Sequence, residues 1–138
     1  LHTKRHRTEE KEAYARAQEL LEFMGLSQFA NAPAGSLPYG QQRLVEITRA
    51  LASNPSLLLL DEPAAGMNSK EKSDLDVIIK RIMQRWDLSV LIVEHDMDLV
   101  MNISDYIYVL NYGKMLASGT PEEIQNNPAV IEAYLGGE

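Results

Sequence analysis

The sequence predicts an α/β fold in which parallel β-strands are flanked by helices. Two short apolar runs, residues 57 to 61 and 88 to 95, have the length and composition of strands. Between them, a helix over about 69 to 86 is expected, because Asn68 and Glu71 have the spacing of a capping box. A strand, a helix and a second strand over about 35 residues form a right-handed crossover unit, so both strands should lie parallel in one sheet.

The composition is that of one soluble domain. The chain has 138 residues and is 45% hydrophobic, which is enough to form a core. Its net charge of -7 argues against broad binding of nucleic acid. Only the first seven residues, LHTKRHR, are basic, and we expect them to form a solvated or frayed terminus.

Several classes of protein are excluded or disfavoured by residues that the sequence lacks. The absence of cysteine excludes a disulfide scaffold and a thiolate metal site. No apolar stretch approaches the roughly 18 to 20 residues that cross a bilayer, and the N-terminus lacks the apolar core of a signal peptide. The first residue is Leu rather than Met, which suggests a piece of a longer protein.

The first 55 residues are expected to be helical. Residues 8 to 24 form an amphipathic pattern in which Thr8 can cap the helix and Gly25 can end it. A polar link then leads to a second helix that Pro38 can begin. The apolar stripe of this helix consists of Leu44, Ile47, Ala50 and Leu51, and Pro55 lies beyond its end.

The C-terminal third should hold a short helix, a hairpin and a final helical segment. The helix spans 96 to 103, and the hairpin spans 106 to 119 with its turn at 111 to 113. Thr120, Pro121 and Glu123 provide the cap, the first-turn proline and the capping-box acid of the last segment, which Asn127 and Pro128 interrupt.

A ligand site is predicted where the two parallel strands end. Asp61 and Glu62 follow the first strand, and residues 94 to 96 (Glu, His, Asp) follow the second. Open parallel sheets bind ligands just outside the carboxyl ends of their strands. An aspartate that holds magnesium and a glutamate that polarises an attacking water are what phosphoryl transfer requires. The alternative is that the two carboxylates only cap the adjacent turn.

His95 and the segment LPYGQ, residues 37 to 41, are further candidates. A neutral imidazole at His95 can donate a hydrogen bond to a terminal phosphate or orient water, although a packed or surface role is the alternative. A metal site of Glu62, His95 and Asp96 is a third possibility, but its spacing matches no common ligand pattern. Gly40, just inside a helix start, leaves backbone amides open to an anion, or is only a convenient glycine.

These motifs together resemble the nucleotide-binding subunit of an ABC transporter. LPYGQ, RALASNP, LLLLDEP and IVEHD occur in that family's order and spacing. The family signature is usually LSGGQ; Leu37, Pro38, Tyr39, Gly40 and Gln41 occupy its place here. The resemblance implies that this motif contacts ATP bound by a partner subunit. Because Pro38 and Tyr39 replace the serine and the first glycine, Gly40 and Gln41 are the stronger candidates.

The same resemblance assigns roles to the residues at the strand ends. Asp61 matches the Walker B aspartate that serves Mg2+, and Glu62 matches the catalytic glutamate. His95 matches the switch histidine that senses the γ-phosphate. Four residues lie where the D-loop is found and are expected to contact a second ATP-binding subunit: Ala65, Gly66, Met67 and Asn68.

The resemblance implies the C-terminal part of a P-loop NTPase fold of the ABC ATPase type. Residues 1–55 would be a helical (signature) subdomain segment, and 56–138 the C-terminal part of the ATPase core with its hairpin and short helices. A P-loop reads GxxxxGK followed by Ser or Thr, and no such string occurs in the chain. We therefore expect the chain alone to be an inactive fragment.

Three longer segments resemble importers of branched-chain amino acids: LPYGQQRLVEITRAL, DEPAAGMN and GTPEEIQNNPAVIEAYLGGE. This implies ATP and Mg2+ as cofactors and a place at the cytoplasmic face of the cell membrane. The implied partners are a second ATP-binding subunit, transmembrane permease subunits and, indirectly, a solute-binding protein, with no nucleic acid. The alternatives are a soluble ABC ATPase of DNA repair or translation, which usually carries long insertions or tandem cassettes, and a non-catalytic interaction module.

Overall fold

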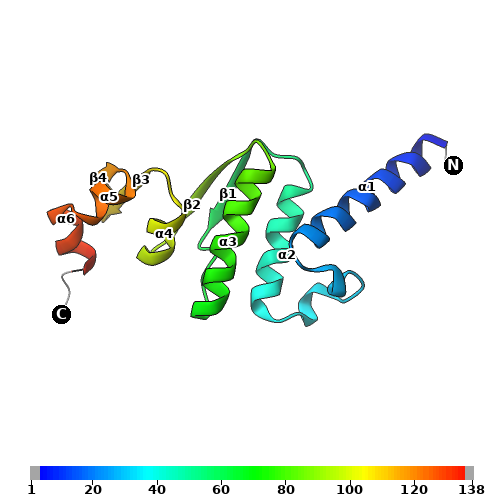
Figure 1. Cartoon of the computed structure of the whole chain (residues 1–138), viewed down its shortest axis with the longest axis horizontal. Helices are drawn as coiled ribbons and strands as arrows, with labels where there is room; N and C mark the ends of the chain where they lie inside the picture. Colours follow the sequence, from blue (N-terminus) through cyan, green and yellow to red (C-terminus); the bar gives the residue numbers. More distant parts are fainter. Residues whose placement is uncertain (1–3, 136–138) are drawn as a thin grey trace.

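The computed structural model describes residues 4–135 and places its elements along one long axis, with α1 at one end and the C-terminal elements at the other (Figure 1). The elements in chain order are α1 (Lys4–Phe23), η1 (Ser27–Phe29), η2 (Ala34–Ser36), α2 (Tyr39–Leu51), β1 (Leu57–Asp61), α3 (Ser69–Arg85), β2 (Ser89–Val93), α4 (Met97–Ile103), β3 (Ile107–Asn111), β4 (Lys114–Gly119), α5 (Pro121–Gln125), α6 (Pro128–Val130) and η3 (Ile131–Leu135). The α/β class predicted from the sequence is confirmed.

Helix α1 begins earlier than the sequence suggested. It starts at Lys4, so Thr8 lies inside the helix rather than at its cap. Of the two expectations for this end, residues 4–7 are helical rather than frayed, while His6 and Arg7 are exposed as a solvated end would be. The imidazole Nε2 of His6 lies 3.6 Å from Glu10 Oε1, an i,i+4 pair that favours the added turn. Residues 1–3 lie outside the described part. The helix ends at Phe23, and Gly25, the predicted stop, follows with a φ of 72° that suits glycine.

The predicted polar link contains the two short 3-10 helices η1 and η2 and leads into α2. Pro38 is the N-cap of α2, and the Gln42 side chain donates a 2.8 Å hydrogen bond to the Leu37 carbonyl. Within the predicted stripe, Ala50 is exposed. Thr48 is buried on that helix, and its hydroxyl donates to the Leu44 carbonyl.

Strands β1 and β2 pair in parallel, as the crossover pattern predicted. Leu57 lies opposite Ser89, and Asp61 lies opposite Val93. Burial alternates along β1, so its apolar side chains face both the core and the surface. The apolar residues on the uncovered face are Leu57, Leu59, Leu91 and Val93, which are 50%, 64%, 54% and 58% exposed.

The other face of this sheet forms the main core with the helices. Helix α3 begins with the predicted capping box, in which the Asn68 side chain accepts from the Glu71 amide and the Glu71 carboxylate accepts from the Asn68 amide. Its buried residues pack with those of neighbouring elements. The fully buried side chains of this core are Leu20, Leu26, Leu51, Leu75, Ile79 and Ile82.

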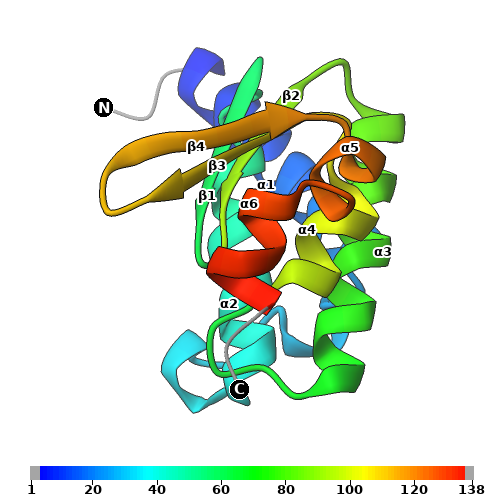
Figure 2. The same cartoon turned by 90° about the vertical axis from the view of Figure 1, so that its left-hand side faces the viewer.

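The C-terminal elements form a second, smaller core. Strands β3 and β4 are antiparallel, and their two-residue turn has positive φ at Tyr112 and Gly113, as a hairpin of this type requires. The Thr120 and Glu123 capping box opens α5 as predicted. Among residues 4–135, the hairpin shares no strand pairing with β1 and β2, and Figure 2 shows its strands running across theirs.

None of the described helices combines the length and the apolar character that a membrane span requires.

Candidate functional site

The polar residues that follow β1 and β2 lie at the same edge of the sheet. Asp61 is the last residue of β1 and is exposed. The Glu62 amide donates a 2.8 Å hydrogen bond to the Val93 carbonyl, which extends the pairing by one residue. Glu62 itself has a φ of 44°, a left-handed conformation that is rare for a residue with a side chain. This turn directs the chain away from the sheet directly after Asp61.

Glu62 and His95 face each other across this edge. The imidazole Nδ1 of His95 lies 3.5 Å from Glu62 Oε1, and their side chains are 72% and 54% exposed. A contact between two side chains this exposed contributes little to folding. Both side chains are accessible to a ligand, as side chains that activate water or bind phosphate must be.

The metal site of Glu62, His95 and Asp96 is not formed. No three His, Cys, Asp or Glu side chains of the described residues gather closely enough to hold a metal ion. Asp96 instead binds Lys72 Nζ at 2.5 Å and caps α4 by accepting from the Leu99 amide. Magnesium, however, is commonly held by one or two carboxylates together with water and substrate phosphates. The exposed carboxylate of Asp61 fits that donor set.

The Lys72–Asp96 pair joins α3 to the start of α4. The hydrogen bond from Lys72, and then the one from the Leu99 amide, holds the pKa of Asp96 below its ordinary value. The hydrogen bond to Asp96 raises the pKa of Lys72. Both groups therefore remain charged over a wider range of pH than they would in an unfolded chain.

The signature segment begins α2 with Tyr39 partly exposed on its first turn. Arg43 donates two hydrogen bonds to the Tyr39 hydroxyl, 3.0 Å from Nε and 2.7 Å from Nη2, and its guanidinium lies 5.1 Å from the ring centre. Hydrogen bonds to Glu46 and then to Tyr39 raise the pKa of Arg43. These contacts fix the orientation of the tyrosine ring.

Gly40 and Gln41 are less exposed than a simple phosphate-binding loop would suggest. Gly40 is buried, and a Cβ added to it would lie 2.8 Å from Glu71 Oε1. The Gln41 side-chain oxygen is buried and has no hydrogen-bond partner among the described residues. Leu37 is also buried, so Tyr39 is the residue of this motif with the most accessible large side chain.

Residues 65 to 68 lie directly beside the signature segment. Gly66 has a φ of 74°, and a Cβ there would lie 3.1 Å from Tyr39 Cε1, so the ring occupies the space that a side chain would need. Met67 is buried in the main core, while Asn68 caps α3. Ala65 is half-buried, and Gly66 and Asn68 are exposed.

Three residues near the site were not singled out from the sequence as site residues: Arg43, Glu71 and Lys72. Glu94 was named at the predicted site but was given no role of its own. Arg43 follows Tyr39 by one helical turn, a spacing that indicates a side-chain contact. Glu71 was recognised only as a helix cap. The contacts of Lys72 and Glu94 join residues 24 and 30 positions apart, and no local pattern predicts them.

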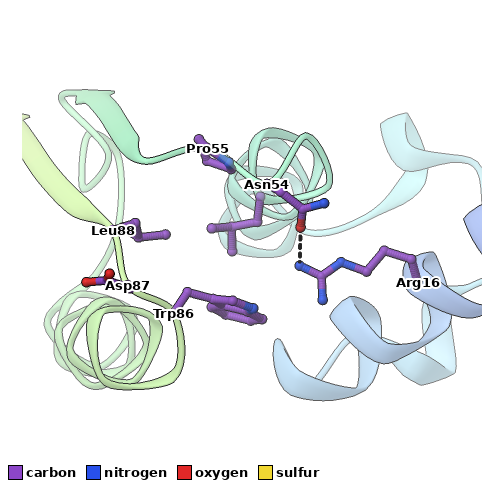
Figure 3. A pocket seen from close by; sticks show the side chains of 7 residues that line it. Arg16, Asn54, Pro55, Trp86, Asp87 and Leu88 are labelled. Carbon is purple, nitrogen blue, oxygen red and sulfur yellow. Dashed lines mark hydrogen bonds between the residues drawn. The ribbon is translucent and has the colours of Figure 1, made fainter.

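A cavity of about 190 Å3 lies at the opposite end of the sheet, where Pro55 precedes β1 and Leu88 precedes β2 (Figure 3). Arg16 reaches from α1 and donates a 2.9 Å hydrogen bond to Asn54 Oδ1. Its guanidinium lies 5.5 Å from the centre of the Trp86 ring. A second cavity, of about 160 Å3, lies on the Asp61 side and is lined in part by Arg43, Glu46 and Leu59.

Two family models match the chain. The model described as "ABC transporter" matches residues 1–65, and the one described as "Branched-chain amino acid ATP-binding cassette transporter" matches residues 114–138. A Pseudomonas aeruginosa protein, the high-affinity branched-chain amino acid transport ATP-binding protein BraF, is 52% identical over 130 residues, or 94% of this chain and 51% of that protein.

A second relative and a solved structure agree with these matches. The Escherichia coli protein LivG, also named for high-affinity branched-chain amino acid transport, is 51% identical over 136 residues, covering 99% of this chain and 53% of its own length. The chain thus spans about half the length of these curated relatives. The ADP conformation of an ATP-binding cassette of an ABC transporter superposes with a TM-score of 0.82 at 35% identity, covering 91% of this chain and 51% of that one.

The order of the motifs, the parallel strands that bring Asp61, Glu62 and His95 to one edge, and these matches agree. The chain belongs to the ATP-binding proteins of the ABC transporter family.

Proposed function

We propose that the chain is part of an ATP-hydrolysing subunit of an ABC importer that takes up branched-chain amino acids. The observation that carries the proposal is the pair formed by Glu62 and His95, 3.5 Å apart at the edge where Asp61 ends its strand. The names of the matched relatives support the transport role and the class of solute. They disfavour a soluble ATPase of DNA repair or translation.

Each residue of the edge has a distinct chemical task in this proposal. Asp61 would hold Mg2+, which when bound neutralises charge on the phosphates. Glu62 accepts a hydrogen bond from the attacking water and increases its nucleophilicity. His95 donates a hydrogen bond to the phosphoryl group being transferred and stabilises its negative charge. The exposure of Glu62 and His95 leaves both side chains accessible to ATP.

The phosphate-cradling loop has no counterpart in these residues, because the sequence contains no GxxxxGK followed by Ser or Thr. The uncovered apolar face of β1 and β2 fits this observation, since a sheet of this kind is normally covered on both faces. We infer that residues 1–55 and 56–138 are the helical segment and the later part of the core of a larger ATPase domain. By itself the chain is expected to hydrolyse ATP negligibly.

The proposed assembly places the signature motif against a partner's nucleotide. Tyr39 is the accessible large side chain of that motif, and Ala65 and Gly66 lie beside it as contacts for a second ATP-binding subunit. Membrane permease subunits and, indirectly, a solute-binding protein complete the importer. The subunit would lie peripherally at the cytoplasmic face of the membrane.

The test is Glu62→Gln in the full-length subunit. The amide cannot accept the water's proton, so hydrolysis should fall by about 100-fold or more while ATP binding is retained. Binding is measured with a fluorescent ATP analogue, and turnover by release of inorganic phosphate. Turnover near the unmutated rate would contradict the role of Glu62, and an inactive unmutated protein would favour a non-catalytic module.

A further inference from the structure

Glu94 directly precedes His95, one of the two candidate catalytic residues, but has no role in the proposal above. It follows β2 directly and is partly buried. One carboxylate oxygen, Oε1, accepts a 2.9 Å hydrogen bond from the Ala64 amide. The other, Oε2, accepts from the amide of His95 at 3.2 Å. A single side chain is thus bonded to the backbone on both sides of the site.

The Ala64 amide lies beyond the last backbone hydrogen bond between the two strands, and Glu94 accepts its hydrogen bond instead. Glu62 is the last residue of this segment whose amide bonds to β2, through the Val93 carbonyl. Pro63 has no amide hydrogen to donate. The next donor is the Ala64 amide, and Ala64 is buried, so this amide needs a partner within the protein. Glu94 supplies it.

The position of Glu62 depends on this contact. Glu62 has a left-handed backbone with a φ of 44°, and the Ala65 amide bonds back to its carbonyl at 3.1 Å in the turn that follows. Such a conformation persists only when surrounding contacts hold it. On one side the turn is held by Val93, and on the other by Glu94, while Gly66 further along packs against Tyr39.

We propose that Glu94 is a positioning residue that sets the distance between Glu62 and His95 by binding the backbone on both sides. This inference rests on the proposed ATPase function. Glu94 acts through the backbone amides of Ala64 and His95, so its loss should lower the rate of hydrolysis and leave the affinity for ATP nearly unchanged. A displacement of about 1 Å in a catalytic group can slow a reaction on the order of a hundredfold.

The experiment compares three variants of the full-length subunit: Glu94→Ala, Glu94→Gln and Asp98→Ala. The Gln side chain keeps an oxygen that accepts from the Ala64 amide. Asp98 is an exposed acid in the first turn of α4, so its removal controls for a lost negative charge near the site. The readouts are kcat, KM for Mg-ATP, and hydrogen exchange of the Ala64 amide.

We expect Glu94→Ala to lower kcat by about tenfold or more with KM within about threefold, and to speed exchange at Ala64 by a similar factor. Glu94→Gln keeps an acceptor for the Ala64 amide but replaces the other oxygen with an NH2 group that cannot accept from the His95 amide, so it should restore the slow exchange at Ala64 and only part of kcat. Asp98→Ala should resemble the unmutated protein. Glu94→Ala with unmutated kcat, or Glu94→Gln as impaired as Glu94→Ala, would overturn the inference. An unmutated subunit without ATPase activity would instead overturn the proposed function.

Discussion

The two ends of the β1–β2 sheet are built in different ways. At the carboxyl end, Glu62 and His95 are exposed and touch each other only at 3.5 Å. At the amino end, side chains interlock: the rings of Phe23 and Trp86 meet edge to face with centres 4.7 Å apart, and Arg16 lies over Trp86. One end leaves its functional side chains accessible to a ligand, while the other contributes packing.

The difference indicates that the proposed hydrolysis and the stability of the fold depend on separate residues, at opposite ends of one small sheet. The carboxyl end holds its side chains through backbone hydrogen bonds, such as those made by the amides of Glu62 and Ala64. A side chain there can be replaced with little loss of packing. The amino end depends on aromatic contact area, which a substitution removes directly.

The largest expected effect is at the carboxyl end. His95→Ala in the full-length subunit should lower turnover at saturating Mg-ATP by about 100-fold, since it removes the donor to the transferred phosphoryl group. Its free energy of unfolding should change by less than about 0.5 kcal/mol, because the side chain is 72% exposed. Phosphate release and urea unfolding measure the two quantities. A large loss of stability would contradict the separation of the two ends.

Trp86→Ala should show the reverse behaviour. Trp86 packs against Phe23 and lies under Arg16, so its removal should lower the free energy of unfolding by about 2 to 3 kcal/mol. Turnover of the folded protein should stay within about threefold of the unmutated rate, since the residue is at the far end of the strands. Trp86→Phe, which keeps an aromatic ring, is the matched control and should lose less.

Gly66→Ala tests the contact between the signature segment and the turn after Glu62. Gly66 has a φ of 74°, which is strained for a residue with a side chain. The added Cβ would also lie 3.1 Å from the Tyr39 ring. The expected loss in the free energy of unfolding is about 1 to 2 kcal/mol. If the ring contact contributes, adding Tyr39→Ala should reduce the penalty. Gly35→Ala, where nothing lies within 4 Å of the added carbon, is the control and should be nearly neutral.

Acid should weaken the link between α3 and α4. The pKa of Asp96 is lowered from 3.8, so the stability that its ionised form contributes is present above that value and is lost as pH falls through the lowered pKa. Asp96→Asn keeps a helix cap but removes the charge, and should flatten this part of the pH dependence. Urea unfolding from neutral to acid pH measures it, with Asp98→Asn as the control. An unchanged acid slope in Asp96→Asn would contradict the assignment.

The smallest effect is expected at Glu19, which forms exposed ion pairs with two arginines at the amino end of the β1–β2 sheet. Glu19 Oε2 lies 3.1 Å from Arg16, and its Oε1 lies 3.4 Å from Arg85. Glu19→Gln should lower the free energy of unfolding by less than about 0.5 kcal/mol, and salt should remove the difference. A larger loss of stability would indicate that Glu19 also holds Arg16 and Arg85 against the Trp86 ring.

Local signals in the sequence predicted much of the fold. The capping boxes of α3 and α5 and the turn at Tyr112 and Gly113 each depend on residues within a few positions of one another. The parallel pairing of β1 and β2 followed from the helix that connects them as a crossover. Because the strands are parallel, Asp61 at the end of β1 and His95 after β2 lie at the same edge of the sheet.

Contacts between distant residues could not be predicted in the same way. The packing of Tyr39 on Gly66 and the bond from the Ala64 amide to Glu94 depend on how separate elements meet. The start of α1 was also missed, since Thr8 is a good cap but the preceding residues continue the helix. The leucines of β1 are unbroken in the sequence, and only the structure shows that every second one is exposed.

The left-handed backbone of Glu62 limits how this protein can be engineered for heat resistance. Three described residues other than glycine have positive φ: Asn54, Glu62 and Tyr112. Replacing such a residue with glycine relieves strain, and the exposed Tyr112 is a suitable site. The same change at Glu62 would remove the carboxylate that the proposed reaction needs. A library selected only for melting temperature should therefore enrich Glu62→Gly, and a screen that also requires turnover should eliminate it.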